Sequence, residues 1–106
     1  MTITRVSETE LRDRFNAAEY YEKVQAGELL ATLIARRPPD PAYRQPPGTL
    51  SETWRYDAAR GNRLEKVAIV HQFVLPDGTI NNRSHRPDPK FLRTEDGTFA
   101  LDRNHP

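Results

Sequence analysis

The chain has 106 residues, of which 36% are hydrophobic, nine are proline and none is cysteine. This length predicts one domain with a single modest core, and the lack of cysteine excludes disulfides, thiolate chemistry and cysteine-bound zinc. Sixteen Lys and Arg against 15 Asp and Glu leave a formal net charge of +1, which gives no global attraction to nucleic acid or to an anionic membrane.

The beginning of the sequence, MTITRVSETELRDRF, has no apolar run of the kind found in a signal peptide. No stretch approaches the roughly 20 apolar residues of a membrane-spanning helix. We therefore expect a cytoplasmic protein that has no membrane partner, and the absence of cysteine agrees with a reducing compartment.

The N-terminal third has the spacing of an amphipathic helix. Ser7 and Glu10 stand three residues apart, as in a capping box. Apolar residues then recur at steps of four and three, which places them on one helical face. They are Leu11, Phe15, Ala18, Tyr21 and Val24. The pattern predicts a helix over residues 7–25.

A second apolar cluster follows Gly27, which could end this helix or be a weak point in a longer one. Its members are Leu29, Leu30, Leu33 and Ile34. Arg36-Arg37 would complement a helix C-terminal dipole, and the prolines that follow must stop a helix. We expect a second helix over 28–37, so that 7–37 is helical, with a single kinked helix as the alternative.

The pattern changes to a period of two after a proline-rich stretch. Residues 38–49 are expected to form an extended connector. The sequence from Leu50 onward predicts an antiparallel sheet, because apolar and polar residues alternate around Trp54 and the run LEKVAIVHQFVL is apolar on both faces. Asp-Gly pairs at 77–78 and 96–97 predict two hairpins, the first returning as a short strand from Thr79.

Helices that precede strands in the sequence indicate an α+β fold. We expect an N-terminal helix or helix pair packed on a three- to five-stranded antiparallel sheet that is built from the two Asp-Gly hairpins. The sheet would span residues 50–102, and residues 103–106 would form a frayed tail. The whole chain, 1–106, would be one domain.

The three histidines differ in their surroundings. His71 lies in the apolar strand and is interpreted as a structural histidine whose ring meets a polar neighbour. His85 lies between Arg83 and Arg86 in a polar segment closed by prolines. His105 is near the C-terminus. Their spacing does not form a set of three or four zinc ligands, so neither a metal site nor a cofactor is predicted.

Residues 81–90, NNRSHRPDPK, are not needed by the predicted core and form the first candidate for a binding site. The segment is polar and basic, which is the expected electrostatic footprint of a nucleic-acid contact. The candidate binding residues are Asn81, Asn82, Arg83, His85, Arg86 and Lys90. From this we predict a small non-enzymatic binding domain whose partner is a protein or a nucleic acid, with RNA favoured over DNA.

Two alternatives stay open. A metal-independent ribonuclease or toxin-like enzyme could use His85 for proton transfer, with Arg83 and Arg86 stabilising the phosphorane charge. A small inhibitor or adaptor protein of a mobile element is also compatible with this size. In addition, an edge strand, such as the one predicted from Thr79, could pair with a second copy to form a homodimer.

Overall fold

The computed structural model describes residues 2–102. The predicted tail, 103–106, and with it His105, lies outside the described residues. The helices are α1 (Glu8–Ala17) and α2 (Tyr20–Gln25). The strands are β1 (Ile3–Val6), β2 (Leu30–Arg37), β3 (Leu50–Arg60), β4 (Arg63–Val74), β5 (Asp88–Thr94) and β6 (Gly97–Leu101).

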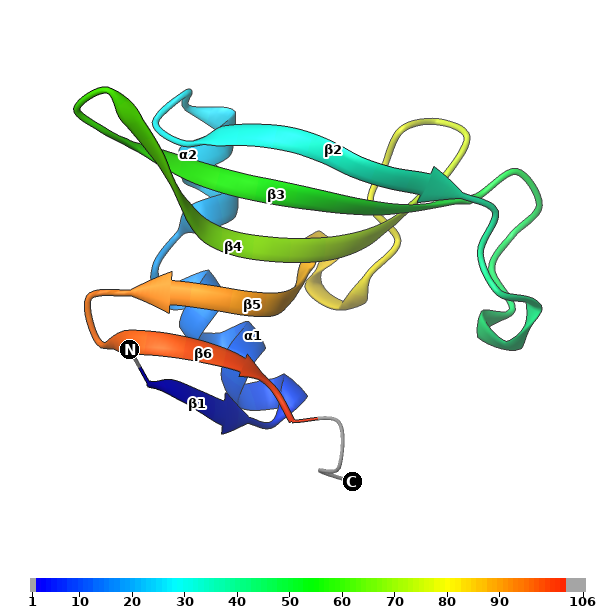
Figure 1. The fold of residues 1–106 in the computed structure, drawn as a ribbon. Coiled ribbons are helices and arrows are strands. Elements are labelled where there is room, and N and C mark those ends of the chain that lie inside the picture. Colours follow the sequence, from blue (N-terminus) through cyan, green and yellow to red (C-terminus); the bar gives the residue numbers. More distant parts are fainter. Residues whose placement is uncertain (1, 103–106) are drawn as a thin grey trace.

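The six strands form one sheet in the order β1-β6-β5-β4-β3-β2. The two helices lie together behind the sheet in Figure 1, and the opposite face carries no helix. The α+β class is therefore confirmed, but the prediction of three to five strands is wrong. The sheet is also mixed, because β1 runs parallel to β6 while the other neighbours are antiparallel.

The predicted N-terminal helix forms as two segments. The Ser7 hydroxyl accepts from the Glu10 amide at 3.1 Å and caps α1. Glu19 takes a left-handed conformation with φ of 58°, which separates α1 from α2. The left-handed Gly27 then ends α2, and the Glu28 amide bonds back to the Lys23 carbonyl at 2.8 Å, as in a Schellman motif.

The second predicted helix, 28–37, is wrong: these residues begin after Gly27 and form the edge strand β2. Their apolar cluster fits helical spacing, but pairing with the long strand β3 satisfies the backbone of the segment instead. Ala31 and Leu33 point toward the helices, and β2 bulges between Leu33 and Ala35. Tertiary pairing has therefore overridden a local pattern.

The two turns with Asp-Gly pairs differ. Thr94 pairs with Gly97 where β5 turns into β6. After Asp77-Gly78 the expected strand from Thr79 does not form, and only an isolated bridge joins Ile80 to Val74. Accordingly, the sheet edge proposed for pairing with a second copy is not at Thr79; the edges are β1 and β2.

The core lies between the helices and the sheet. Leu11 and Phe15 of α1 are fully buried, and they belong to one core cluster with residues of β3 to β6 on the inner face. Those sheet residues include Tyr56, Ala68, Val70, Leu92 and Phe99. Within the described residues, no helix has the length and apolar character needed to cross a bilayer.

Candidate functional site

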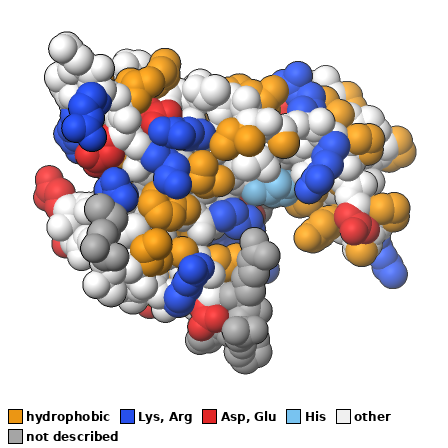
Figure 2. Space-filling view, viewed as in Figure 1, with side chains coloured by type: hydrophobic (Ala, Val, Ile, Leu, Met, Phe, Trp, Pro, Cys, Tyr) orange, Lys and Arg blue, Asp and Glu red, His pale blue; other side chains and the backbone are white. Residues whose placement is uncertain are grey.

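The face of the sheet that lacks helices is defined by strand alternation. Leu92 and Val70 are buried on the inner face, so Phe91 and His71 point to the other side. We call this side the open face. Figure 2 looks onto it: basic and hydrophobic side chains are interspersed across its surface, and acidic side chains are sparse toward its centre.

Aromatic rings form a row on the open face. The Phe73 ring lies 5.3 Å from the Tyr43 ring and 4.6 Å from the His71 ring, measured between centroids. Tyr43 comes from the proline-rich connector and is 63% exposed. Phe91 on β5 adds a partly exposed ring one strand away. We call Tyr43, Phe73, His71 and Phe91 the open-face rings.

Cations surround these rings. The Lys66 Nζ lies 4.4 Å from the centroid of the Phe91 ring, and the Arg93 guanidinium lies 6.0 Å from it. Lys90 and Arg37 are exposed, and both are close enough to His71 to lower the pKa of its ring. We call Lys66, Lys90, Arg37 and Arg93 the open-face cations.

One acid on the open face, Asp57 of β3, is neutralised by an arginine. Asp57 is buried, and its Oδ1 lies 2.8 Å from an Arg55 guanidinium nitrogen. On the helix side, Glu8, Glu10 and Glu22 are likewise paired with arginines. Among residues 2–102, the open-face cations Lys66, Lys90 and Arg37 form no salt bridge, so no carboxylate neutralises them.

His71 is a polar group within the aromatic row. Its Nε2 lies 2.7 Å from the Ser51 hydroxyl, in line with the polar neighbour predicted from the sequence. Burial lowers the pKa of the ring below its ordinary value of 6.5, the cations Lys90 and Arg37 lower it further, and Asp88 opposes them. The ring is therefore neutral at pH 7, when it can stack without adding charge.

The segment 81–90 is less free than its sequence suggests. Asn82 is buried: its Oδ1 accepts from the Phe73 amide at 2.8 Å, and its Nδ2 donates to the His71 carbonyl at 3.0 Å. Asn82 also reaches Asp88, which in turn binds Arg12 of α1. The side chain of Asn82 is therefore engaged in holding the loop against β4 and β5.

The remaining candidate residues of the segment point in different directions. The Asn81 Nδ2 donates to Gln45 of the connector at 2.8 Å, and the Arg86 Nε lies 2.6 Å from Glu22 of α2. Arg83 and His85 are exposed on the loop, while Lys90 is exposed beside the open face. Of these candidates, Lys90, in β5, is therefore the one that lies beside the open face.

The residues of the predicted catalytic group differ in their surroundings. The exposed His85 ring meets the Ile80 carbonyl at 3.3 Å, whereas Arg86 is engaged by Glu22 on α2. Across residues 2–102, the structure contains no group of three His, Asp or Glu residues that could hold a metal ion.

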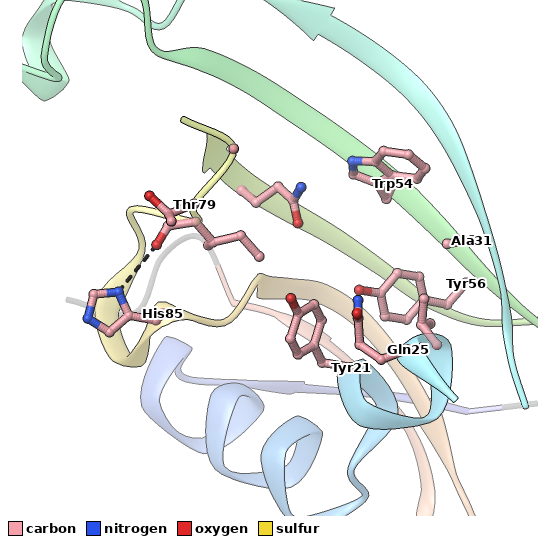
Figure 3. A pocket seen from close by; sticks show the side chains of 11 residues that line it. Tyr21, Gln25, Ala31, Trp54, Tyr56, Thr79 and His85 are labelled. Atoms are coloured by element: carbon pink, nitrogen blue, oxygen red, sulfur yellow. Dashed lines mark hydrogen bonds between the residues drawn. The ribbon is translucent and has the colours of Figure 1, made fainter. Parts of the chain in front are cut away.

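A pocket lies on the inner face of the sheet, beside α2 (Figure 3). Helix α2 forms one wall, strands β2 to β4 form the floor, and the loop after β4 forms the opposite wall. The cavity measures about 560 Å³. Its lining includes Tyr21, Gln25, Trp54, Tyr56, Gln72 and His85. We call it the inner pocket.

A buried carboxylate holds part of the pocket floor. Glu52 is 4% exposed, and its Oε1 accepts from Trp54 Nε1 at 2.9 Å and from Gln72 Nε2 at 3.0 Å. Its Oε2 lies 2.8 Å from the Arg36 Nε. Burial would raise the pKa of Glu52, but the hydrogen bonds from Trp54, Arg36 and Gln72 outweigh it and leave the pKa lowered.

The sequence analysis missed Glu52. A signal for Glu52 was present: it has the same strand parity as Trp54 and Tyr56 in a strand of alternating residues, so an acid on the same face as these rings could have been noted. The contact between Tyr43 and Phe73 had no comparable signal, because no periodic pattern fixes where a proline-rich connector folds back.

Comparison with known proteins returned no match to any family model, curated protein or solved structure.

Proposed function

We propose that this protein is a non-enzymatic binding domain for single-stranded nucleic acid, RNA in the first instance, and that the open face is the contact surface. The observation that carries the proposal is the row of open-face rings bordered by the open-face cations. Rings supply stacking surfaces for bases, and cations between them meet the phosphates that link those bases.

The exposure of the rings favours stacking as their role. Tyr43 is 63% exposed, and Phe73, His71 and Phe91 are partly exposed with no helix over them. Base stacking on an aromatic ring contributes about 1–3 kcal/mol per base, whatever the base. A row of this kind would therefore bind with little sequence preference.

The arrangement favours a single strand over a duplex. The rings lie on a sheet face, which cannot enter a groove as a helix does, and duplex bases are already stacked on one another. A single strand can turn its bases toward Phe73 and Phe91 while its phosphates approach Lys66 and Lys90. Arg83, exposed on the loop, could extend the path of the backbone.

The charges also predict the strength of the salt dependence. With the four open-face cations each meeting one phosphate, the slope of log K against log salt would be about −3 for a single strand. The near-neutral remainder of the chain would add little, so the affinity should be moderate and should fall steeply with added salt.

The proposal is tested by fluorescence anisotropy with a labelled oligouridine. The chain contains only three lysines, Lys23, Lys66 and Lys90. Replacing both open-face lysines, Lys66→Gln with Lys90→Gln, should weaken binding roughly tenfold and make the salt slope shallower by about 1 or more. Lys23→Gln on α2, away from the open face, is the matched control and should bind like the wild type.

Other outcomes would change the proposed contact surface, activity or partner. Equal binding by the double variant and by Lys23→Gln would exclude the open face. Cleavage of the RNA in EDTA, abolished by His85→Ala, would instead support the ribonuclease alternative. Tighter binding to oligothymidine than to oligouridine would replace RNA with single-stranded DNA. No binding to either, with capture of a host protein, would favour a protein partner, as expected of an inhibitor or adaptor.

A further inference from the structure

The buried Glu52 network does not serve the hydrophobic core. A charge taken out of water needs compensation, and a well-packed apolar residue in its place is often equally stable. Glu52 is nevertheless buried on the inner face, and two of its three side-chain partners, Trp54 and Gln72, line the inner pocket. The network therefore fixes the orientation of pocket side chains, which is what a preformed binding site requires.

The network determines what each side chain offers to a ligand. The Trp54 N–H is occupied by Glu52, so the indole presents its ring and not a donor. The Gln72 amide nitrogen is likewise turned to Glu52, which leaves the Gln72 carbonyl oxygen as an acceptor. Burial raises the pKa of the Tyr56 hydroxyl, so it stays protonated and remains a donor.

The remaining residues that line the inner pocket are also aromatic, apolar or neutral polar. Tyr21 and Gln25 project from α2, and His85 lies on the opposite wall, as Figure 3 shows. Apolar contacts come from Val24, Ala31 and Ile80. Among the described lining residues there is no Lys, Arg, Asp or Glu. Aromatic rings with neutral donors and acceptors suit a planar ring system that carries no formal charge.

We propose that the inner pocket binds a neutral planar heteroaromatic molecule that fits between α2 and the floor formed by Trp54 and Gln72. The cavity of about 560 Å³ lies within the usual range for small-molecule sites. The ligand would contact the indole of Trp54 and accept or donate hydrogen bonds at the Gln72 carbonyl and the Tyr56 hydroxyl. This site lies on the face opposite to the nucleic-acid surface and does not depend on it.

The chain supplies its own reporter, because Trp54 is its one tryptophan. The probes are adenine and quinoxaline, which are neutral and planar, with the anion quinoline-2-carboxylate as the comparison. We expect both neutral probes to change the Trp54 fluorescence saturably, with dissociation constants in the high micromolar to millimolar range. The anion should bind at least about fivefold more weakly, since a carboxylate would lose its hydration in the pocket and the described lining holds no Lys or Arg to pair with it.

Variants separate the pocket from other sites of binding. Glu52→Gln keeps the volume but leaves one acceptor oxygen for three donors, those of Trp54, Gln72 and Arg36, so it should weaken both neutral probes about tenfold. Glu65→Gln, the same change on β4 outside the pocket lining, is the matched control and should bind normally. Ala31→Phe, which fills the pocket from β2, should abolish binding even if Glu52→Gln proves too unstable to use.

The proposal is overturned if neither neutral probe gives a saturable change, if the anion binds as tightly, or if folded Ala31→Phe retains binding. Circular dichroism and thermal unfolding would verify that each variant is folded. Unchanged oligouridine binding in the lysine variant, together with saturable probe binding, would disprove only the open-face proposal. Weakened oligouridine binding in that variant, with no saturable probe binding by the wild type, would disprove only the pocket.

Discussion

The Nε atom of Arg86 lies 2.6 Å from Oε2 of Glu22, although 64 residues separate them in the sequence. Glu22 belongs to α2, and Arg86 follows the loop that carries Thr79 and His85. The pair therefore joins the two opposite walls of the inner pocket. Arg86 was a binding candidate in the sequence analysis, whereas in the structure it holds the loop in place.

Because both side chains are about 40% exposed, breaking this pair should affect the loop more than global stability. We expect Glu22→Gln to lower the free energy of unfolding by only about 0.5 kcal/mol. Hydrogen exchange should become faster at the amides of residues 79–86 and stay unchanged in β5 and β6. The i,i+4 pair Arg14–Glu10 offers a control, Glu10→Gln, which should leave exchange in the loop unaltered.

Nucleic-acid binding should raise the pKa of His71. In the free protein Lys90 and Arg37 lower that pKa, after burial, which is the largest cause. Phosphates placed beside these cations would neutralise them and favour protonation of the ring. An NMR titration of the His71 ring, with and without oligouridine, measures the shift. The variant with Lys66→Gln and Lys90→Gln is the control and should show a smaller shift at His71; an equal shift in that variant would argue against contact at the open face.

The fold was predictable where local and tertiary preferences agree, and unpredictable where they conflict. The cap at Ser7 and the apolar face through Leu11 and Phe15 specify a helix by themselves, and the long apolar run of β4 specifies a central strand. The segment after Gly27 satisfies the helical pattern equally well, but its pairing partner, β3, begins 20 residues later and no local signal reveals it.

The site was less predictable than the fold because it depends on residues distant in the sequence. Composition showed a basic segment at 81–90, and Lys90 is the member of it that lies beside the open-face rings. Tyr43 reaches Phe73 across 30 residues, and the open-face cations Arg37, Lys66 and Lys90 come from three different strands, β2, β4 and β5. A net charge of +1 therefore concealed a local excess of cations.

Removing one ring should weaken RNA binding without changing its salt dependence. Phe91→Leu keeps apolar contact for Lys66 but removes a stacking surface, so we expect a loss of about 1–2 kcal/mol of binding free energy at an unchanged salt slope. The lysine double variant should show the opposite behaviour, with a shallower slope. Anisotropy titrations at several salt concentrations distinguish the two, and a change of slope in Phe91→Leu would contradict stacking.

The lowered pKa of His71 also predicts a pH dependence of stability. The unfolded chain takes up a proton at His71 near its ordinary value of 6.5, while the folded ring resists protonation until lower pH. Stability from this group is therefore complete above about pH 6.5 and is lost as the pH falls toward the folded pKa. His71→Gln should flatten this part of the profile relative to the wild type in urea unfolding experiments, and an unchanged profile would exclude His71 as its cause.

Glu52 should determine the pH dependence of stability in a separate, more acidic pH range. Its pKa is lowered from an ordinary value of 4.5 because the hydrogen bonds to Trp54, Arg36 and Gln72 outweigh burial. Its contribution is therefore present above about pH 4.5 and is lost as the pH falls through the folded pKa. Glu52→Gln should lower the free energy of unfolding at pH 7 by about 1–2 kcal/mol, since one oxygen replaces two acceptors.

The difference in the free energy of unfolding between Glu52→Gln and the wild type should shrink in acid. Protonation removes the carboxylate charge of Glu52 in the wild type, and the substitution has already removed that charge in the variant. Urea unfolding between neutral pH and about pH 3, within the range where a carboxylate titrates, measures it. Glu65→Gln, whose carboxylate lies 3.9 Å from Arg60 at the surface, should change stability little at any pH. A gap between the Glu52 variant and the wild type that stayed constant with pH would mean that the carboxylate charge does not hold Trp54 and Gln72 in place.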